Sequence, residues 1–368
     1  MRILVYEFAS GGGLAGRDVP ASLVREGAAM RAALVADLSA IGTHEIVTTA
    51  DPRCGGSLPH GVEIVTLPAG DHQRNAMLDL VIADVDAVWV IAPETGGCLE
   101  QLAVKAERHG RTLAGSGAAA IAAASNKAQL ARRLGEAGVR HPKTRRVAAS
   151  GDADAAARDI GYPVVVKPIC GAGGHGVCVA RDARELRGAV DAARHAGGRS
   201  DVLVQEFVRG AAASVSLLAN GRDALALTVN AQTIGWPASF EYLGGETPFE
   251  HPAAPLAVTA ALDTCRAVAG LRGFVGVDVV LTETDAVVIE LNPRLTTAYL
   301  GVRAAIDENL AALALAACAG DLPAHPQTRR HVRFTAGGAV ATDGDHEVTK
   351  TRSAREEIGM CSWSRLRG

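Results

Sequence analysis

The stretch from residue 273 to residue 295 most constrains how this chain folds. Two segments rich in valine flank the polar turn "TETD", which predicts an antiparallel β-hairpin. Such a hairpin belongs in a core, yet it carries Asp278, Glu290, Asn292 and Arg294. Because an unpaired buried carboxylate is costly, a partner must offset these charges.

Strand geometry brings these polar residues together. Glu290 and Asn292 stand two residues apart and therefore share one face of a strand, which Arg294 continues if the strand persists. The turn makes Asp278 a neighbour of Glu290 on the partner strand. Three oxygen-bearing side chains at one point suit a hard cation such as Mg²⁺, so we predict a metal site here. The alternative is a solvated sheet face with an ordinary arginine–carboxylate pair.

The first 115 residues alternate between strand and helix patterns. Predicted strands span 2–8, 44–50, 62–68, 87–93 and 111–116, and predicted helices span 25–42 and 98–110. Apolar strands that alternate with helices predict an α/β region with a parallel sheet covered on both faces. Ligands of such sheets lie beyond the carboxyl ends of the strands, where the polar loops "EFASGGG" and "APETGG" stand.

The pattern changes after residue 116 and predicts an α+β region. We expect helices at 125–139, with Ser125 or Asn126 as the N-cap, and at 183–197, 255–271 and 306–320. Predicted strands surround a glycine-rich turn between residues 162 and 182 and continue at 201–210, 213–221, 223–235 and, near the end, 331–340.

Two further segments have the chemistry of a nucleotide site. Lys167 ends an apolar strand and is followed by Gly171, Gly173, Gly174 and Gly176. Backbone N–H groups of such a loop can face phosphate oxygens, although most glycine-rich hairpins are only turns. The apolar strand that ends in "QEFV", residues 205–208, can present backbone and carboxylate groups to an adenine edge, or it is an ordinary strand end.

Composition excludes several classes of protein. The 368 residues are 48% hydrophobic, enough for two or three domains. A net charge of -3 and 4% aromatic residues argue against nucleic-acid binding. No apolar run approaches the roughly 18 residues that span a bilayer, and "MRILVYEFAS" is typical of a strand, so we expect no membrane association and a cytoplasmic protein. Seven cysteines without a CxxC pair indicate reduced thiols.

The order of these elements carries a family resemblance. Lys127, "VVVKP", the glycine loop, "QEFV", "GVDVV" and "ELNPR" follow one another. In this order they resemble the ATP-grasp superfamily of carboxylate–amine ligases from about residue 116 to residue 320. The resemblance implies a pre-grasp α/β domain (1–115), a linker helix with a small lid subdomain (116–200), a large subdomain with the metal site (201–325) and a tail (326–368).

The resemblance also implies roles, with ATP and Mg²⁺ as cofactors and Mn²⁺ as a substitute metal. Lys127 and Lys167 would hold the α- and β-phosphates. The phosphate lid would consist of Gly173, Gly174, His175 and Gly176. The adenine site would consist of Gln205, Glu206, Phe207 and Val208. The metal ligands would be Asp278, Glu290 and Asn292. Arg294 would stabilise the acyl phosphate and the oxyanion that follows it. The stretch "RGAAASVS" lacks the acid that meets the ribose in many members, which leaves Ser214 and Ser216 as candidates.

The expected reaction joins a carboxylate to an amine through an acyl phosphate and releases ADP and phosphate. "YEFASGG", "SVSLLANG", "YLGGETPFEH" and "NPRLTTAYLG" resemble the subfamily of tyramine–glutamate ligases of methanofuran and methylofuran biosynthesis. That resemblance implies amino-acid and amine substrates, L-glutamate with tyramine or tyrosine, and allows a homodimer. Other amino-acid or D-alanine-type ligases, a biotin-carboxylase-like enzyme and a nucleotide-binding regulator without turnover remain alternatives.

Five residues are candidates for substrate binding. Glu7 and Glu94 lie in or beside the polar loops at the strand ends and can hold an ammonium group, or they cap neighbouring helices. Ser10 and Gly11 leave room for backbone approach, and Tyr242 offers an aromatic wall to a ring-bearing amine.

Overall fold

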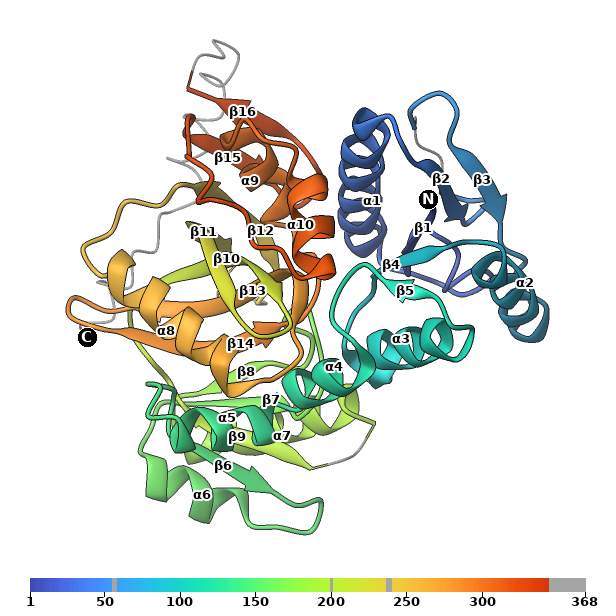
Figure 1. Cartoon of the computed structure of the whole chain (residues 1–368). Helices are drawn as coiled ribbons and strands as arrows, with labels where there is room; N and C mark the ends of the chain where they lie inside the picture. Colours follow the sequence, from blue (N-terminus) through green and yellow to red (C-terminus); the bar gives the residue numbers. More distant parts are fainter. Residues whose placement is uncertain (55–57, 199–200, 236–239, 344–368) are drawn as a thin grey trace.

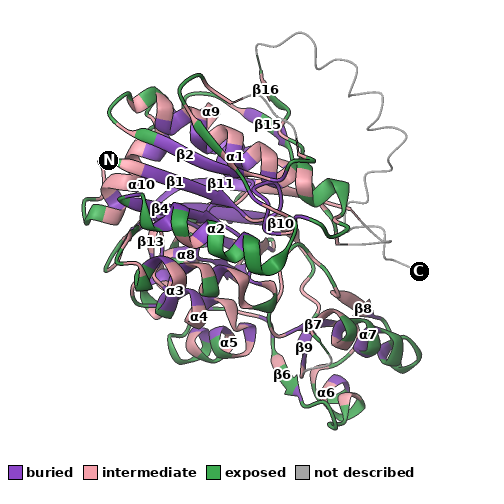
Figure 2. Ribbon diagram, turned by 90° about the vertical axis from the view of Figure 1, so that its right-hand side faces the viewer, coloured by how far each residue is buried: buried purple, intermediate pink, exposed green. Residues whose placement is uncertain are grey.

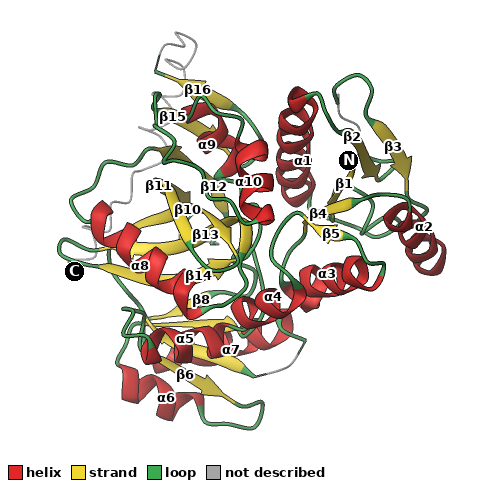
Figure 3. Cartoon of the chain, in the orientation of Figure 1, coloured by secondary structure: helices red, strands yellow, loops and turns green. Residues whose placement is uncertain are grey.

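The computed structural model describes the whole chain except residues 55–57, 199–200, 236–239 and 344–368. Its described part contains three β-sheets with helices packed against them (Figure 1; Figure 3). The first sheet is parallel and the other two have antiparallel strand pairs, as the sequence predicts. None of the helices that the structure describes is long and apolar enough to cross a bilayer.

The N-terminal sheet has the strand order β3-β2-β1-β4-β5. Its strands are β1 (Arg2–Glu7), β2 (Glu45–Ala50), β3 (Glu63–Thr66), β4 (Ala87–Ile91) and β5 (Thr112–Leu113). The helices of this region are α1 (Ala21–Ile41), α2 (Asp71–Ala83), the 3₁₀ turn η1 (Thr95–Gly97) and α3 (Cys98–Arg108). Alternate residues of β1 face opposite sides, so Ile3 packs in the cluster of α1 and Leu4 in that of α2 and α3.

Two helices lead into a small four-stranded unit. They are α4 (Ala118–Ser125) and α5 (Lys127–Glu136), and the Asn126 side chain caps α5 by accepting from the Gln129 N–H at 3.1 Å. The unit comprises β6 (Thr144–Val147), α6 (Ala153–Ile160), β7 (Val164–Pro168), β8 (Cys178–Ala180), α7 (Ala183–Ala196) and β9 (Val202–Glu206). Its strand order is β6-β9-β7-β8, and Figure 2 shows it set apart at the lower right. Strand β9 belongs to this sheet, so the sheet extends past the boundary expected at residue 200.

The remaining strands form a seven-stranded sheet of order β14-β13-β10-β11-β12-β15-β16. These are β10 (Ala211–Asn220), β11 (Ala224–Ile234), β12 (Tyr242–Thr247), β13 (Arg272–Leu281), β14 (Ala286–Asn292), β15 (Val332–Thr335) and β16 (Val340–Thr342). The accompanying helices are α8 (Ala254–Ala267), α9 (Tyr299–Ala305) and α10 (Leu310–Ala319). One face packs on α8, while Leu218, Leu227 and Phe274 on the other face share a core with α1 and α10. Figure 1 shows α1 beside α10 at this junction.

Several local predictions differ from the structure. Helix α1 begins at Ala21, four residues before the predicted start, and α8 ends at Ala267 rather than at residue 271. The strand predicted at 331–340 is two strands, because residues 336–339 form a turn that contains Gly338 at a φ of 96°. Most of the tail predicted at 326–368 lies outside the described residues, but β15 and β16 join the large sheet.

Candidate active site

The hairpin of β13 and β14 brings the predicted metal ligands together. Asp278 stands directly opposite Glu290 in the register, and Gly276 stands opposite Asn292. The Asn292 amide donates to Asp278 Oδ2 at 3.0 Å. These residues lie on the sheet face away from α8, since Val277, Val279 and Leu291 between them pack in the α8 core. Period-two alternation therefore places the polar side chains on one face, as the sequence predicts.

Sequence reasoning missed Gln232, on β11. Its Nε2 donates to Asp278 Oδ1 at 2.9 Å, so two amides hold the two oxygens of one carboxylate. The available signal was the alternation of Thr228, Asn230 and Gln232, three polar residues spaced two apart and therefore on one face of a strand. The two amides fix the orientation of the Asp278 carboxylate and leave its remaining lone pairs for a further partner.

The environment of Asp278 disfavours its negative charge. Burial raises its pKa to about 6, and the neighbouring Glu290 carboxylate contributes to the rise. The hydrogen bonds from Asn292 and Gln232 act in the opposite direction and offset this only in part. Two carboxylates held face to face favour binding of a cation, because a cation between them relieves both repulsion and desolvation.

Two lysines from other elements face Glu290. Lys127, the first residue of α5, forms an ion pair with Glu290 Oε1 at 2.6 Å and donates to the Gly171 carbonyl at 2.7 Å. Burial disfavours the charge of Glu290, but Lys127 and Lys167 outweigh it and lower the pKa of the carboxyl group. Lys167 is buried on β7; its burial, with the nearby Lys127 ammonium, lowers its pKa to about 8. A bound anion would raise this pKa again.

Arg294 follows the end of β14 and pairs with Glu94 of the N-terminal region. Its Nε and Nη2 donate to the two Glu94 oxygens at 2.8 and 3.0 Å, and its Nη1 donates to the Leu295 carbonyl at 3.2 Å. The Glu94 side chain is 2% exposed. Glu94 makes no side-chain cap to the adjacent helical turn, so the helix-capping alternative does not describe it.

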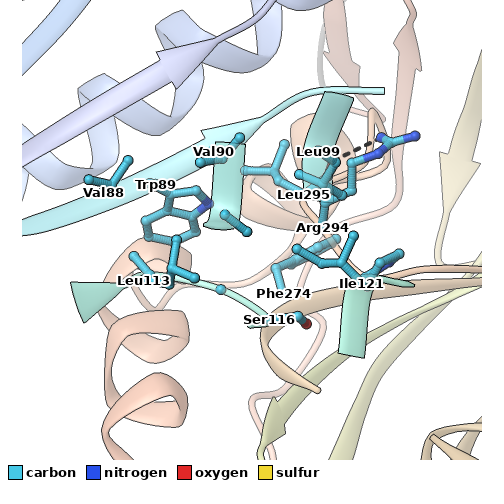
Figure 4. A pocket seen from close by; sticks show the side chains of 14 residues that line it. Val88, Trp89, Val90, Leu99, Leu113, Ser116, Ile121, Phe274, Arg294 and Leu295 are labelled. Atoms are coloured by element: carbon cyan, nitrogen blue, oxygen red, sulfur yellow. Dashed lines mark hydrogen bonds between the residues drawn. The ribbon is translucent and has the colours of Figure 1, made fainter. Parts of the chain in front are cut away.

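A cavity of about 20 Å³ lies behind Arg294, between the parallel sheet and the 293–295 segment. Figure 4 shows Trp89, Leu113 and Phe274 around it, with the Arg294 guanidinium pointing away from these apolar side chains. The cavity is large enough for one water molecule and too small for a nucleotide. It therefore belongs to the packing behind the arginine.

The glycine loop after β7 contacts both neighbouring regions. Gly173, Gly174 and Gly176 adopt positive φ values of 67°, 73° and 75°, which L-residues with a Cβ rarely adopt. A Cβ at Gly174 would clash with the Phe240 carbonyl of the large-sheet region. The Ala172 N–H donates to Thr95 Oγ1 at 3.1 Å, next to Glu94. His175 of this loop is exposed.

The segment predicted to meet adenine is at the end of β9, which pairs with β7, the strand of Lys167. Gln205 is buried and donates from Nε2 to Thr144 Oγ1 at 2.8 Å, while the Glu206 carboxylate accepts from the Lys143 N–H at 3.1 Å. Phe207 and Val208 are half-buried. The bonds of Gln205 and Glu206 therefore join them to the chain around β6 rather than to the group around Glu290.

The hydroxyls of Ser214 and Ser216 are not open to a ribose. Both residues are buried, and the Asn230 amide donates to each hydroxyl, at 3.2 and 3.0 Å. Because these hydroxyls lie within the sheet network, they do not replace the missing acid in the way the sequence suggested.

The predicted substrate residues at the end of β1 form a closed turn. Glu7 is 4% exposed and accepts from the Ala9 N–H at 3.0 Å and from the N–H and hydroxyl of Ser10 at 2.5 and 2.6 Å. Burial raises the pKa of Glu7 despite these bonds. Gly11 leaves no room for a side chain, because a Cβ would clash with the Glu7 carbonyl. Tyr242 packs against the cluster of Ala298, Leu300 and Phe334.

The residues present fit a hard divalent cation. The described residues hold no group of three or more histidine, cysteine, aspartate or glutamate side chains placed for a metal. The predicted set instead combines two carboxylates with an amide oxygen, Asp278, Glu290 and Asn292. Burial, together with the Glu290 carboxylate, raises the pKa of Asp278, and a cation would relieve the cost of its charge. Two carboxylates leave the rest of an Mg²⁺ shell to water and phosphate oxygens.

Comparison with known families agrees with this arrangement. A pre ATP-grasp 3 domain model matches residues 44–121, and an ATP-grasp domain model matches residues 124–298. The first model covers most of the region with the parallel sheet, and the second covers the small sheet and most of the large sheet. The chain belongs to the ATP-grasp superfamily.

The individual relatives are only distantly similar to this chain. The tyramine–L-glutamate ligase of Methanocaldococcus fervens is 36% identical over 101 residues, which are 27% of this chain and a third (33%) of that relative's length. The D-alanine–D-alanine ligase of Desulforudis audaxviator is 32% identical over 202 residues, 50% of this chain and 64% of that one. A crystal structure from Archaeoglobus fulgidus, described as an ATP-grasp superfamily protein, has a TM-score of 0.65 and 25% identity, covering 90% of this chain and 92% of that one.

Proposed function

We propose that this ATP-grasp chain is an ATP-dependent ligase that joins a carboxylate to an amine through an acyl phosphate. The observation that supports this most is the convergence of Lys127, Lys167 and Arg294 on the paired carboxylates of Asp278 and Glu290. Three cations and two metal-ligand carboxylates suit the phosphates of ATP and the charge that develops during phosphoryl and acyl transfer.

Each of these residues has a role in that reaction. Lys127 and Lys167 bind the α- and β-phosphates, and the N–H groups of the loop with Gly173, Gly174, His175 and Gly176 cover them. Asp278, Glu290 and Asn292 would hold Mg²⁺, or Mn²⁺ in its place. The bound ion would neutralise charge on the phosphates. Arg294 stabilises the acyl phosphate and then the tetrahedral oxyanion formed when the amine attacks.

Positioning and charge neutralisation therefore account for the chemistry without a covalent enzyme intermediate. The intact set of carboxylates, amide and lysines also argues against a nucleotide-binding regulator without turnover, which would be free to lose Glu290 or Asn292. Residues 205–208 are proposed to meet the adenine, with the Glu206 carboxylate and the Val208 backbone as the recognition groups.

For the substrates we propose L-glutamate and an aromatic amine, tyramine or tyrosine, joined through the γ-carboxylate. Support comes from the partial match to a tyramine–L-glutamate ligase. The comparably similar D-alanine–D-alanine ligase makes a dipeptide ligase the alternative. An amine screen with L-glutamate, and a parallel screen with D-alanine, separates the two.

The nucleotide products test the ligase proposal. With Mg-ATP, L-glutamate and tyramine, we expect stoichiometric ADP and phosphate, because the lysines and metal ligands are arranged for transfer of the terminal phosphoryl group. Coupled assays for ADP and for pyrophosphate, with omission of the amine as control, measure this. Release of AMP and pyrophosphate would contradict the acyl-phosphate route.

A further inference from the structure

The two glutamates predicted to bind substrate, Glu7 and Glu94, are both engaged by other partners. The Glu7 carboxylate accepts three hydrogen bonds from Ala9 and Ser10 of its own turn, and Gly27 of α1 packs directly against it. The two oxygens of Glu94 are both taken by Arg294. An ammonium group at Glu7 or Glu94 would therefore compete with these existing partners.

A third carboxylate, on α1, is less fully engaged. Glu26 is half-buried, and its Oε1 accepts a hydrogen bond from the hydroxyl of Thr297. Thr297 lies three residues after Arg294, in the segment between β14 and α9. This bond places the Glu26 side chain at the segment that carries the arginine.

The surroundings of Glu26 have a matching set of donors. Arg294 has five N–H groups, of which Glu94 and the Leu295 carbonyl occupy three, so two remain for a substrate carboxylate or acyl phosphate. Burial raises the pKa of the Tyr242 phenol, with smaller contributions from Asp278 and Glu26, so it stays a neutral donor. Tyr242 packs against the cluster that contains Ala298, the residue after Thr297, so a carboxylate, a phenol and a guanidinium are all placed at the 294–298 segment.

We propose that Glu26 binds the ammonium group of an amino-acid substrate whose reactive carboxylate is directed at Arg294. This inference rests on the proposed ligase function and assigns the side chain that recognises the amino end of its carboxylate substrate. The paired charges of Glu26 and Arg294 match the opposite charges of a zwitterion, and a carboxylic acid without an amino group would leave Glu26 without a cationic partner. Charge-assisted hydrogen bonds of this kind contribute about 1.5–3 kcal/mol, or roughly ten- to hundredfold in affinity.

The test compares amino acids with counterparts that lack only the amino group. The pairs are L-glutamate with glutarate, D-alanine with propionate, and L-tyrosine with 3-(4-hydroxyphenyl)propionate. Calorimetric titration with Mg²⁺ and a non-hydrolysable ATP analogue gives each dissociation constant for the full chain, for Glu26→Gln and for the control Glu308→Gln, which changes an exposed carboxylate before α10. Glutamine keeps the acceptor for Thr297, so the contact between α1 and this segment survives.

We expect the unchanged chain and Glu308→Gln to prefer the amino acid of at least one pair by about thirtyfold, and Glu26→Gln to lose that preference with nucleotide affinity unchanged. Equal binding of both members of every pair, or a preference that Glu26→Gln retains, would overturn the inference. An assay of ADP release on the same proteins separates the two ideas. If Glu26→Gln releases ADP at the same rate as the unchanged chain, this inference is wrong and the ligase function stands. If the preference for amino acids depends on Glu26 but no ADP is released, the ligase function alone is wrong.

Discussion

Arg294→Lys is expected to lower kcat by about a thousandfold while the protein stays folded. The planar guanidinium binds Glu94 through two N–H groups and keeps two others for the substrate, whereas an ammonium at the end of a flexible chain cannot do both. Loss of a donor to a developing oxyanion costs about a hundred- to a thousandfold in rate. Steady-state ADP release at saturating substrates measures the effect.

Arg303→Lys is the matched control for this variant. Arg303 also binds a carboxylate through two N–H groups, with Asp37 Oδ2 accepting from Nε at 2.9 Å, but it joins α9 to α1 away from Glu290. Its replacement should change the thermal midpoint as much as Arg294→Lys does and leave kcat within a few-fold. Equal losses of kcat in both variants would show that Arg294 is structural.

Glu290→Gln is expected to abolish turnover, with kcat reduced by about a thousandfold or more. The amide keeps an oxygen to accept from Lys127, so the fold persists, but the site loses one of the two carboxylates proposed to bind the metal. Asn292→Ala should act in the same direction, because it removes an amide that holds Asp278 and that we propose binds the metal. ADP release across a range of Mg²⁺ concentrations and Mn²⁺ binding by electron paramagnetic resonance measure both effects.

Glu283→Gln serves as the control on the same hairpin. Glu283 is exposed at the turn between β13 and β14, so its replacement changes the net charge equally without touching the site. Near-normal kcat in Glu290→Gln or Asn292→Ala at saturating Mg²⁺ would refute the metal assignment. A variant that binds Mn²⁺ normally but does not turn over would place the residue at the phosphates instead.

The parts of the site that local patterns determine were predictable from the sequence. Residues two apart on a strand share a face, which pairs Glu290 with Asn292. The short turn brings β14 back beside β13, and a register shift between Asp278 and Val279 then sets Asp278 opposite Glu290. The same reasoning identified the strands and most helices of the N-terminal region, where continuous apolar strands alternate with amphipathic helices.

Contacts between distant segments were not predictable in this way. Glu94 and Arg294 are 200 residues apart, and each was assigned to the site without its partner. Gln232 reaches Asp278, and Glu26 reaches Thr297, only because β11 and α1 pack where they do. Helix α2 was missed because its buried side includes Arg74, whose guanidinium donates to the carbonyls of Ala15 and Ala69, and this charge masks the apolar period.

The most direct test of the proposed function follows an oxygen atom. L-glutamate labelled with ¹⁸O in its γ-carboxylate is incubated with Mg-ATP, tyramine and the full chain, and the phosphate is examined by mass spectrometry. An acyl phosphate predicts that one labelled oxygen of each activated carboxylate appears in the released phosphate, at a one-to-one ratio with the amide formed. Amide formation with unlabelled phosphate, or with the label in AMP, would contradict the account.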